Sequence, residues 1–175
     1  PTSRLLRGDF LFPLGRPADA AAAFAAAYAE APSGVLALRQ AAAWRAAGQP
    51  ARANAALEEW LRREPDSLEA LDQLAQLDLE AGRFAEAERR LSVLAERAPA
   101  NARILNNLAW TLVSTGDAAA LPRAREMAER AYVLLPSAET ADTLGWVLTR
   151  AGEAGRALPL LRQAAAAAGT ASQPN

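Results

Sequence analysis

The chain has 175 residues, a near-neutral balance of 19 basic and 20 acidic residues, and neither histidine nor cysteine. All the basic residues are arginines spread along the chain, so no basic stripe indicates nucleic-acid binding. The missing residue types exclude disulfides, thiol nucleophiles and the commonest general base and metal ligand. No apolar stretch approaches the ~18 residues typical of a membrane-spanning helix.

The composition favours helices. Alanine, the strongest intrinsic helix former, supplies 47 residues. No segment alternates apolar and polar residues over a useful length, which argues against strands. The chain begins at Pro1 without a methionine, and we expect it to be a processed piece of a longer protein.

The first repeat unit, expected over residues 1–33, is the least regular of five. Pro13 should end its first helix near Phe12. Because Gly8 also lies in that helix, we expect the helix to be short. The second helix of the unit is expected over residues 19–30.

Units two and three, residues 34–67 and 68–101, repeat at a spacing of 34 residues. Gly48 aligns with Gly82 and Pro65 with Pro99. Each unit reads as two amphipathic helices that are joined at the glycine and ended by the proline, which is the pattern of a helix–turn–helix array.

Unit four, residues 102–137, carries three extra residues in its turn, within 117–121. Insertions are tolerated best in turns, although a binding loop is the alternative. Pro122 suits the first turn of the helix that follows. In unit five, residues 138–169, we expect Pro159 to lie in the first helical turn, where its missing N–H costs no hydrogen bond. Residues 170–175 are expected to form a tail.

Small residues recur at the eighth place of each unit, where two helices approach closely, and apolar residues recur at the places that face the helix seams. Trp44 and Trp60 fall at such seam places and are expected in the core. The predicted fold class is all-α, a solenoid of about five antiparallel helix pairs. The eighth-place residues are Gly8, Ala41, Ala75, Ala109 and Gly145.

This pattern resembles tetratricopeptide repeat (TPR) proteins over about residues 1–169. The resemblance implies a right-handed superhelix in which the first helix of each pair lines the concave face. It also implies a protein-binding scaffold rather than an enzyme.

A narrower resemblance covers Asn106 to Trp110, the segment REMAERAYVLLP at 125–136, and residues 141–164. These resemble the C-terminal repeats of bacterial envelope TPR lipoproteins of the PEP-CTERM/exosortase exopolysaccharide system. That resemblance implies a periplasmic or outer-membrane-anchored scaffold for polysaccharide export or protein sorting. Without it, a cytoplasmic location is the alternative.

The binding residues are expected at the concave places of the first helices. Trp110 and Trp146 hold equivalent places in units four and five, so we expect them side by side as aromatic anchors. Arg103, Asn106 and Asn107 offer guanidinium and amide groups that suit a peptide backbone or a carboxylate. The predicted peptide- or protein-binding residues are Gln73, Gln76, Arg103, Asn106, Asn107, Trp110, Asp142, Thr143, Trp146 and Arg150.

We expect no catalytic, cofactor or metal site. The serines have no histidine to activate them, and carboxylate neighbours such as Glu86 and Glu88 read as solvated charge. The expected partner is a protein or peptide, with self-association through an uncapped C-terminal repeat as a further possibility. The alternatives are a structural spacer within a longer solenoid and the recognition arm of an enzyme whose catalytic domain is absent from this chain.

Overall fold

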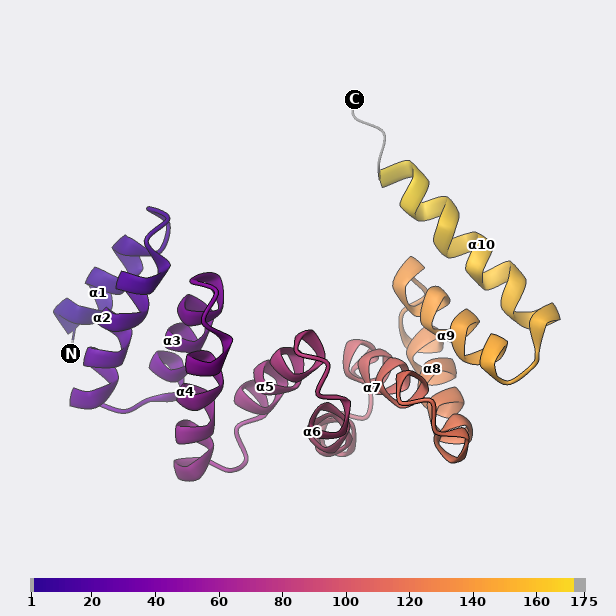
Figure 1. Cartoon of the computed structure of the whole chain (residues 1–175), viewed down its shortest axis with the longest axis horizontal. Coiled ribbons are helices and arrows are strands. Elements are labelled where there is room, and N and C mark those ends of the chain that lie inside the picture. The colour runs from indigo at the N-terminus through magenta and orange to yellow at the C-terminus, as the bar shows by residue number, and fades with distance from the viewer. Residues whose placement is uncertain (1, 172–175) are drawn as a thin grey trace. The chain divides into compact units, whose positions relative to one another are not determined.

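The computed structural model describes the backbone of residues 2–171. Over that range it contains ten α-helices and one short 3₁₀ helix, with no strand (Figure 1). The chain divides into two compact units, Pro1–Leu77 and Asp78–Asn175, and each is described by itself. None of the described helices is both long enough and apolar enough to span a bilayer.

The first unit holds four complete helices and most of a fifth. Neighbouring helices pack in sequence, α1 on α2, α2 on α3 and α3 on α4. The predicted short first helix is confirmed, because α1 ends at Leu11, two residues before Pro13. The helices are α1 Thr2–Leu11, α2 Pro17–Glu30, α3 Gly34–Ala46, α4 Pro50–Arg63 and α5 Leu68–Glu80, whose last residues belong to the second unit.

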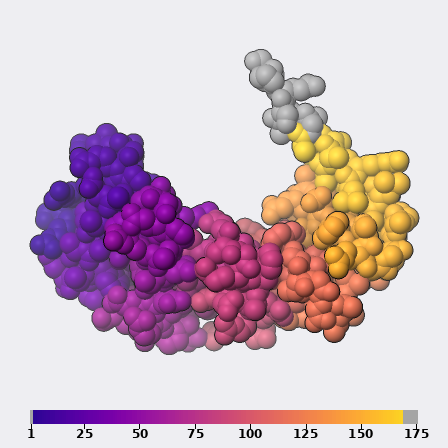
Figure 2. Space-filling view, in the orientation of Figure 1, coloured from indigo at the N-terminus to yellow at the C-terminus, as the bar shows by residue number. Residues whose placement is uncertain are grey.

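The second unit continues the same helix–turn–helix order. Here α6 packs on α7, α7 on α8, α8 on α9 and α9 on α10. The α9 and α10 side chains, orange and yellow in Figure 2, form a continuous body. The elements are α6 Phe84–Arg97, α7 Ala102–Ser114, η1 Ala118–Ala120, α8 Leu121–Leu134, α9 Ala138–Arg150 and α10 Ala154–Ala171.

The 34-residue register is confirmed, since α3, α5 and α7 begin at residues 34, 68 and 102. The turns explain the repeated glycine: Gly48 and Gly116 have φ angles of +70° and +74°, a left-handed conformation that other residues adopt only at a cost. Serine caps help to set the starts of α3 and α9. The Ser137 hydroxyl accepts a hydrogen bond from the Thr140 main-chain N–H at 3.2 Å.

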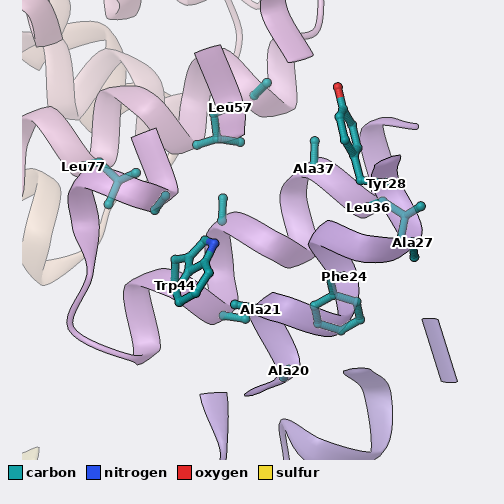
Figure 3. Packing of buried hydrophobic residues seen from close by; sticks show 14 of the residues in the cluster. Ala20, Ala21, Phe24, Ala27, Tyr28, Leu36, Ala37, Trp44, Leu57 and Leu77 are labelled. Atoms are coloured by element: carbon teal, nitrogen blue, oxygen red, sulfur yellow. The ribbon is translucent and has the colours of Figure 1, made fainter. Parts of the chain in front are cut away.

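Alanine, leucine and a few aromatic side chains form the core of the first unit (Figure 3). Trp44 is buried, as expected, and Leu57 is buried as well. Gly8 is small for a steric reason, because a Cβ atom there would lie 2.3 Å from the Phe24 ring. Trp60 is partly buried and meets Tyr28 edge-on, with ring centroids 6.5 Å apart.

The same logic holds in the second unit, where leucines fill the seams between helices. A Cβ atom on Gly145 would lie 2.7 Å from Leu161, so the eighth place is again a point of close helix approach. The leucines buried to 1% exposure or less are Leu91, Leu94, Leu105, Leu108, Leu112 and Leu148.

The three-residue insertion of unit four lies where it was expected. The extra residues form η1, and α8 therefore begins at Leu121 rather than at residue 118. The Asp117 side chain caps η1 by accepting the Ala119 main-chain N–H at 2.9 Å. Pro122 lies at the start of α8, as predicted.

The expectation for Pro159 is wrong. Because α10 begins at Ala154, Pro159 is its sixth residue and lies inside the helix rather than in the first turn. The carbonyl of Gly155, four residues earlier, therefore loses its usual N–H donor. The helix continues past this point to Ala171. Residues 172–175, most of the expected tail, lie outside the described residues.

Candidate functional site

Two exposed tryptophans mark adjacent helices of the second unit. Trp110 on α7 is 40% exposed and Trp146 on α9 is 45% exposed, whereas Trp44 is buried. The helices α7 and α9 contact each other. The edge-on ring of Phe84, 5.6 Å from that of Trp110, supports the Trp110 side chain. Both indole rings therefore retain free surface while at least one is held in place.

Asn106 lies behind this surface. Its side chain is buried, and Nδ2 donates a hydrogen bond to Glu139 Oε1 at 3.4 Å across to α9. Its Oδ1 is buried too and has no hydrogen-bond partner among the described residues. Asp142 occupies the same place on α9 and is exposed. Equivalent places thus differ in accessibility, because α9 covers Asn106.

The other predicted polar residues of α7 and α9 divide in the same way. Arg103 and Arg150 are exposed, and Asn107 is half-buried. The Asn107 main-chain carbonyl accepts the Thr111 hydroxyl at 2.6 Å. Thr143 is buried, with 4% exposure. The accessible members of the predicted set in the second unit are Arg103, Asn107, Trp110, Asp142, Trp146 and Arg150.

Gln73 and Gln76 lie on α5 within the first unit, and both are half-buried. Their amides are partly accessible there. They belong to the first compact unit, whereas α7 and α9 belong to the second.

The sequence reasoning missed Asp78. It stands at the eleventh place of its unit, where Trp44, Leu112 and Leu148 are apolar, and it is 2% exposed. Its Oδ1 accepts hydrogen bonds from Arg83 Nε at 2.9 Å and Nη2 at 2.8 Å, and its Oδ2 pairs with Arg90. An acidic residue at a place that is apolar in the other units was the sequence signal that could have predicted this buried ion pair.

A second charged cluster joins α8 to the start of α10. Glu129 accepts hydrogen bonds from Arg125 and Arg156, both at 3.1 Å, and each arginine also pairs with Glu153. Partial burial raises the pKa of Glu129, but the two guanidinium groups outweigh it and hold that pKa below its ordinary value. The same two carboxylates raise the pKa of Arg156.

Glu88 was expected to be a solvated charge; its side chain keeps 35% exposure but also forms an ion pair. Its carboxylate pairs with Arg123 Nη1 at 3.1 Å, while Arg123 Nη2 donates to the Ser92 hydroxyl at 2.7 Å. The contact links α6 to α8 because residues about one repeat apart meet in a stacked array.

Comparison with known proteins agrees with this architecture. Residues 45–110 match the tetratricopeptide repeat family. The search of curated proteins finds no match.

Solved structures of MamA have a similar fold. MamA 41-end from Desulfovibrio magneticus RS-1 is 18% identical, with a TM-score of 0.84 over 98% of this chain and 97% of that chain. MamA of MSR-1 is 20% identical, with a TM-score of 0.78 over 98% of both chains. MamA of AMB-1 is 22% identical, with a TM-score of 0.77 over 93% of this chain and 88% of that chain. The fold of this chain is therefore an all-α tetratricopeptide-repeat solenoid, and residues 45–110 carry the sequence pattern of that repeat family.

Proposed function

We propose that this chain is a non-catalytic scaffold that binds a peptide segment of a partner protein on the face formed by α7 and α9. The observation that carries the proposal is the pair of exposed tryptophans at equivalent places on two contacting helices. Exposed tryptophan is costly to solvate and is enriched among the residues that supply most of the energy of protein interfaces.

The polar groups around the tryptophans suit an extended peptide. Arg103 and Arg150 are cationic and Asp142 is anionic, and all three are exposed, so this face carries charges of both signs. The half-buried Asn107 amide can donate to and accept from a peptide group. Behind them, the hydrogen bond from Asn106 to Glu139 links α7 to α9, which favours binding by limiting the movement between these helices.

The test begins with a peptide ligand selected from a random library on the immobilised chain. Trp110→Ala and Trp146→Ala should each raise the Kd of that peptide by about thirtyfold, the equivalent of ~2 kcal/mol for an interface anchor. Circular dichroism should show unchanged helix content, because both side chains are exposed.

Phe10→Ala serves as the matched control, since Phe10 is an exposed aromatic residue of the first unit, outside the proposed face. It should leave the Kd unchanged. If no selected peptide bound the two tryptophan variants more weakly than the native chain, this face would be excluded. A loss of helical signal in these variants would instead show that the tryptophans stabilise the fold.

Two other functions make different predictions. A spacer within a longer solenoid would select no peptide, and the recognition arm of an enzyme would require a catalytic domain outside this chain. The polysaccharide-export role rests on the resemblance of units four and five alone, and the family match at residues 45–110 lends it no support.

A further inference from the structure

A second apolar surface lies at the C-terminal end of α8, apart from the tryptophans. It consists of Val133, Leu134 and Leu135, which are 79%, 46% and 54% exposed. Pro99 and Ala100, in the loop between α6 and α7, lie beside it. We call these five residues the α8 edge patch.

The other units show that this apolar run is not a demand of the fold. In units one to four the three residues before the proline that closes the second helix hold the same places. Three of the four runs contain charge, and only the run of unit four is wholly apolar. The runs are 29–31 (Ala-Glu-Ala), 62–64 (Arg-Arg-Glu), 96–98 (Glu-Arg-Ala) and 133–135 (Val-Leu-Leu).

Two shallow hollows in the surface adjoin the patch, and Pro99 and Ala100 line both of them. One hollow, of about 340 Å³, is lined by Val133, Leu134 and the rim residues Glu129 and Arg130. The other, of about 560 Å³, is lined by Leu135, the loop residues and the first two residues of α7, Ala102 and Arg103. Two shallow neighbouring hollows that share Pro99 and Ala100 suit a partner with two protruding apolar side chains.

Hydrogen bonds fix both walls of the patch. Arg130 Nη2 donates to the Pro99 carbonyl at 2.9 Å, which ties the loop to α8. On the other side, the Thr140 hydroxyl donates to the Leu135 carbonyl at 2.7 Å. A ligand would therefore meet a surface that needs little ordering, which favours affinity for a small contact.

The size and shape of the patch decide among occupants. Its few side chains offer on the order of a few hundred Å² of apolar surface. A stable dimer buries about 800 Å² on each partner, which is too much for this patch to supply. A bilayer would accept protruding residues but would leave the two hollows unfilled. A short segment with two bulky apolar residues fits both the area and the relief.

We propose that the α8 edge patch is a second docking surface, which binds a short segment of a partner protein through two bulky apolar side chains. It borders the α7–α9 face at Arg103, but its apolar residues differ from the two tryptophans, so the chain could hold two ligands. The proposal does not depend on the tryptophans being a binding site.

The test uses phage-displayed random peptides selected on the whole chain. Each enriched peptide is synthesised, and its Kd is measured by fluorescence anisotropy. We expect one group of peptides, rich in paired bulky apolar residues, whose Kd rises at least tenfold in the double variant Val133→Glu/Leu135→Glu. The same group should bind Trp110→Ala and the matched control Val93→Glu as tightly as it binds the native chain. Val93 is 41% exposed on α6 and lies outside the patch.

Other outcomes would contradict the proposal, and each can be distinguished from the expected result. The absence of any peptide sensitive to the double variant, with its circular dichroism unchanged, would overturn the proposal. A native dimer in sedimentation that the double variant abolishes would assign the patch to a second copy instead. Binding to phosphatidylcholine–phosphatidylglycerol vesicles that the double variant abolishes would assign it to a membrane. Failure of the tryptophan face alone would leave the response to Val133→Glu/Leu135→Glu intact.

Discussion

The largest departures from the repeat pattern occur at single residues, and Asp78 is the clearest case. Its carboxylate is buried at a place that other units fill with apolar side chains, and it is held by Arg83 and Arg90. The two arginines are 41% and 21% exposed, so they can turn toward water once the acid is removed. This limits the cost of losing the ion pair.

Asp78→Ala should therefore lower the free energy of unfolding by about 2–3 kcal/mol, the range for hydrogen bonds to charged groups. Asp78→Leu should lower it less, because leucine restores the residue type of Leu112 and Leu148 and buried ion pairs are often replaceable by apolar side chains. Urea denaturation of both variants measures the difference. If Asp78→Ala matched the native chain within ~0.5 kcal/mol, the ion pair would be energetically neutral.

Residue-level prediction from sequence succeeded where a place is defined by local sterics. The small eighth place and the buried Trp44 follow from the repeat alone. Residue-level prediction failed where the burial or the ion pair of a side chain depends on a residue about one repeat away. The side chain of Asn106 is covered by α9, and Glu88 meets Arg123 of α8, and neither partner is evident from the spacing within one unit.

Helices and turns were more predictable than single contacts, because each depends mainly on its own sequence. The late start of α8 followed from counting residues after Gly116. Pro159 was misjudged because the start of α10 is marked by no proline or serine cap, and the helix begins early enough to enclose it. The form of the inserted turn, a 3₁₀ helix capped by Asp117, required the structure.

Deleting Ala118–Ala120 should restore the short turn of units two and three without loss of the fold. These residues are not buried, and shortening a loop changes its closure entropy by well under ~1 kcal/mol. The melting temperature and helix content should therefore stay close to those of the native chain. Loss of peptide binding with an unchanged melting temperature would reveal a binding loop. A large drop in melting temperature would show that η1 positions α8.

At the scale of the whole molecule, the free energy of unfolding should depend on pH. Both the net charge of the chain and one local charged cluster contribute to this dependence. The chain carries 20 acidic and 19 basic residues, so protonating the acids leaves a strongly positive molecule that repels itself. Locally, the cluster of Glu129, Glu153, Arg125 and Arg156 joins α8 to α10. Its stabilising effect requires ionised carboxylates.

The sign follows from the lowered pKa of Glu129. The folded chain holds this group ionised more firmly than the unfolded chain does, where the pKa is 4.5. Its contribution is therefore fully present well above pH 4.5 and is lost as the pH falls through the lower pKa of the folded state. Because Glu129 is 39% exposed, the contribution is modest. Glu129→Gln should destabilise the chain slightly at pH 7, and the gap from the native chain should close as the pH falls below 4.5 and through the lower pKa of the folded state. Urea denaturation at pH 7, 5 and 3.5 measures this convergence, with Glu126→Gln as the control for a more exposed glutamate of the same helix. A gap that stays constant with pH would mean that Glu129 stabilises the fold by packing rather than by charge.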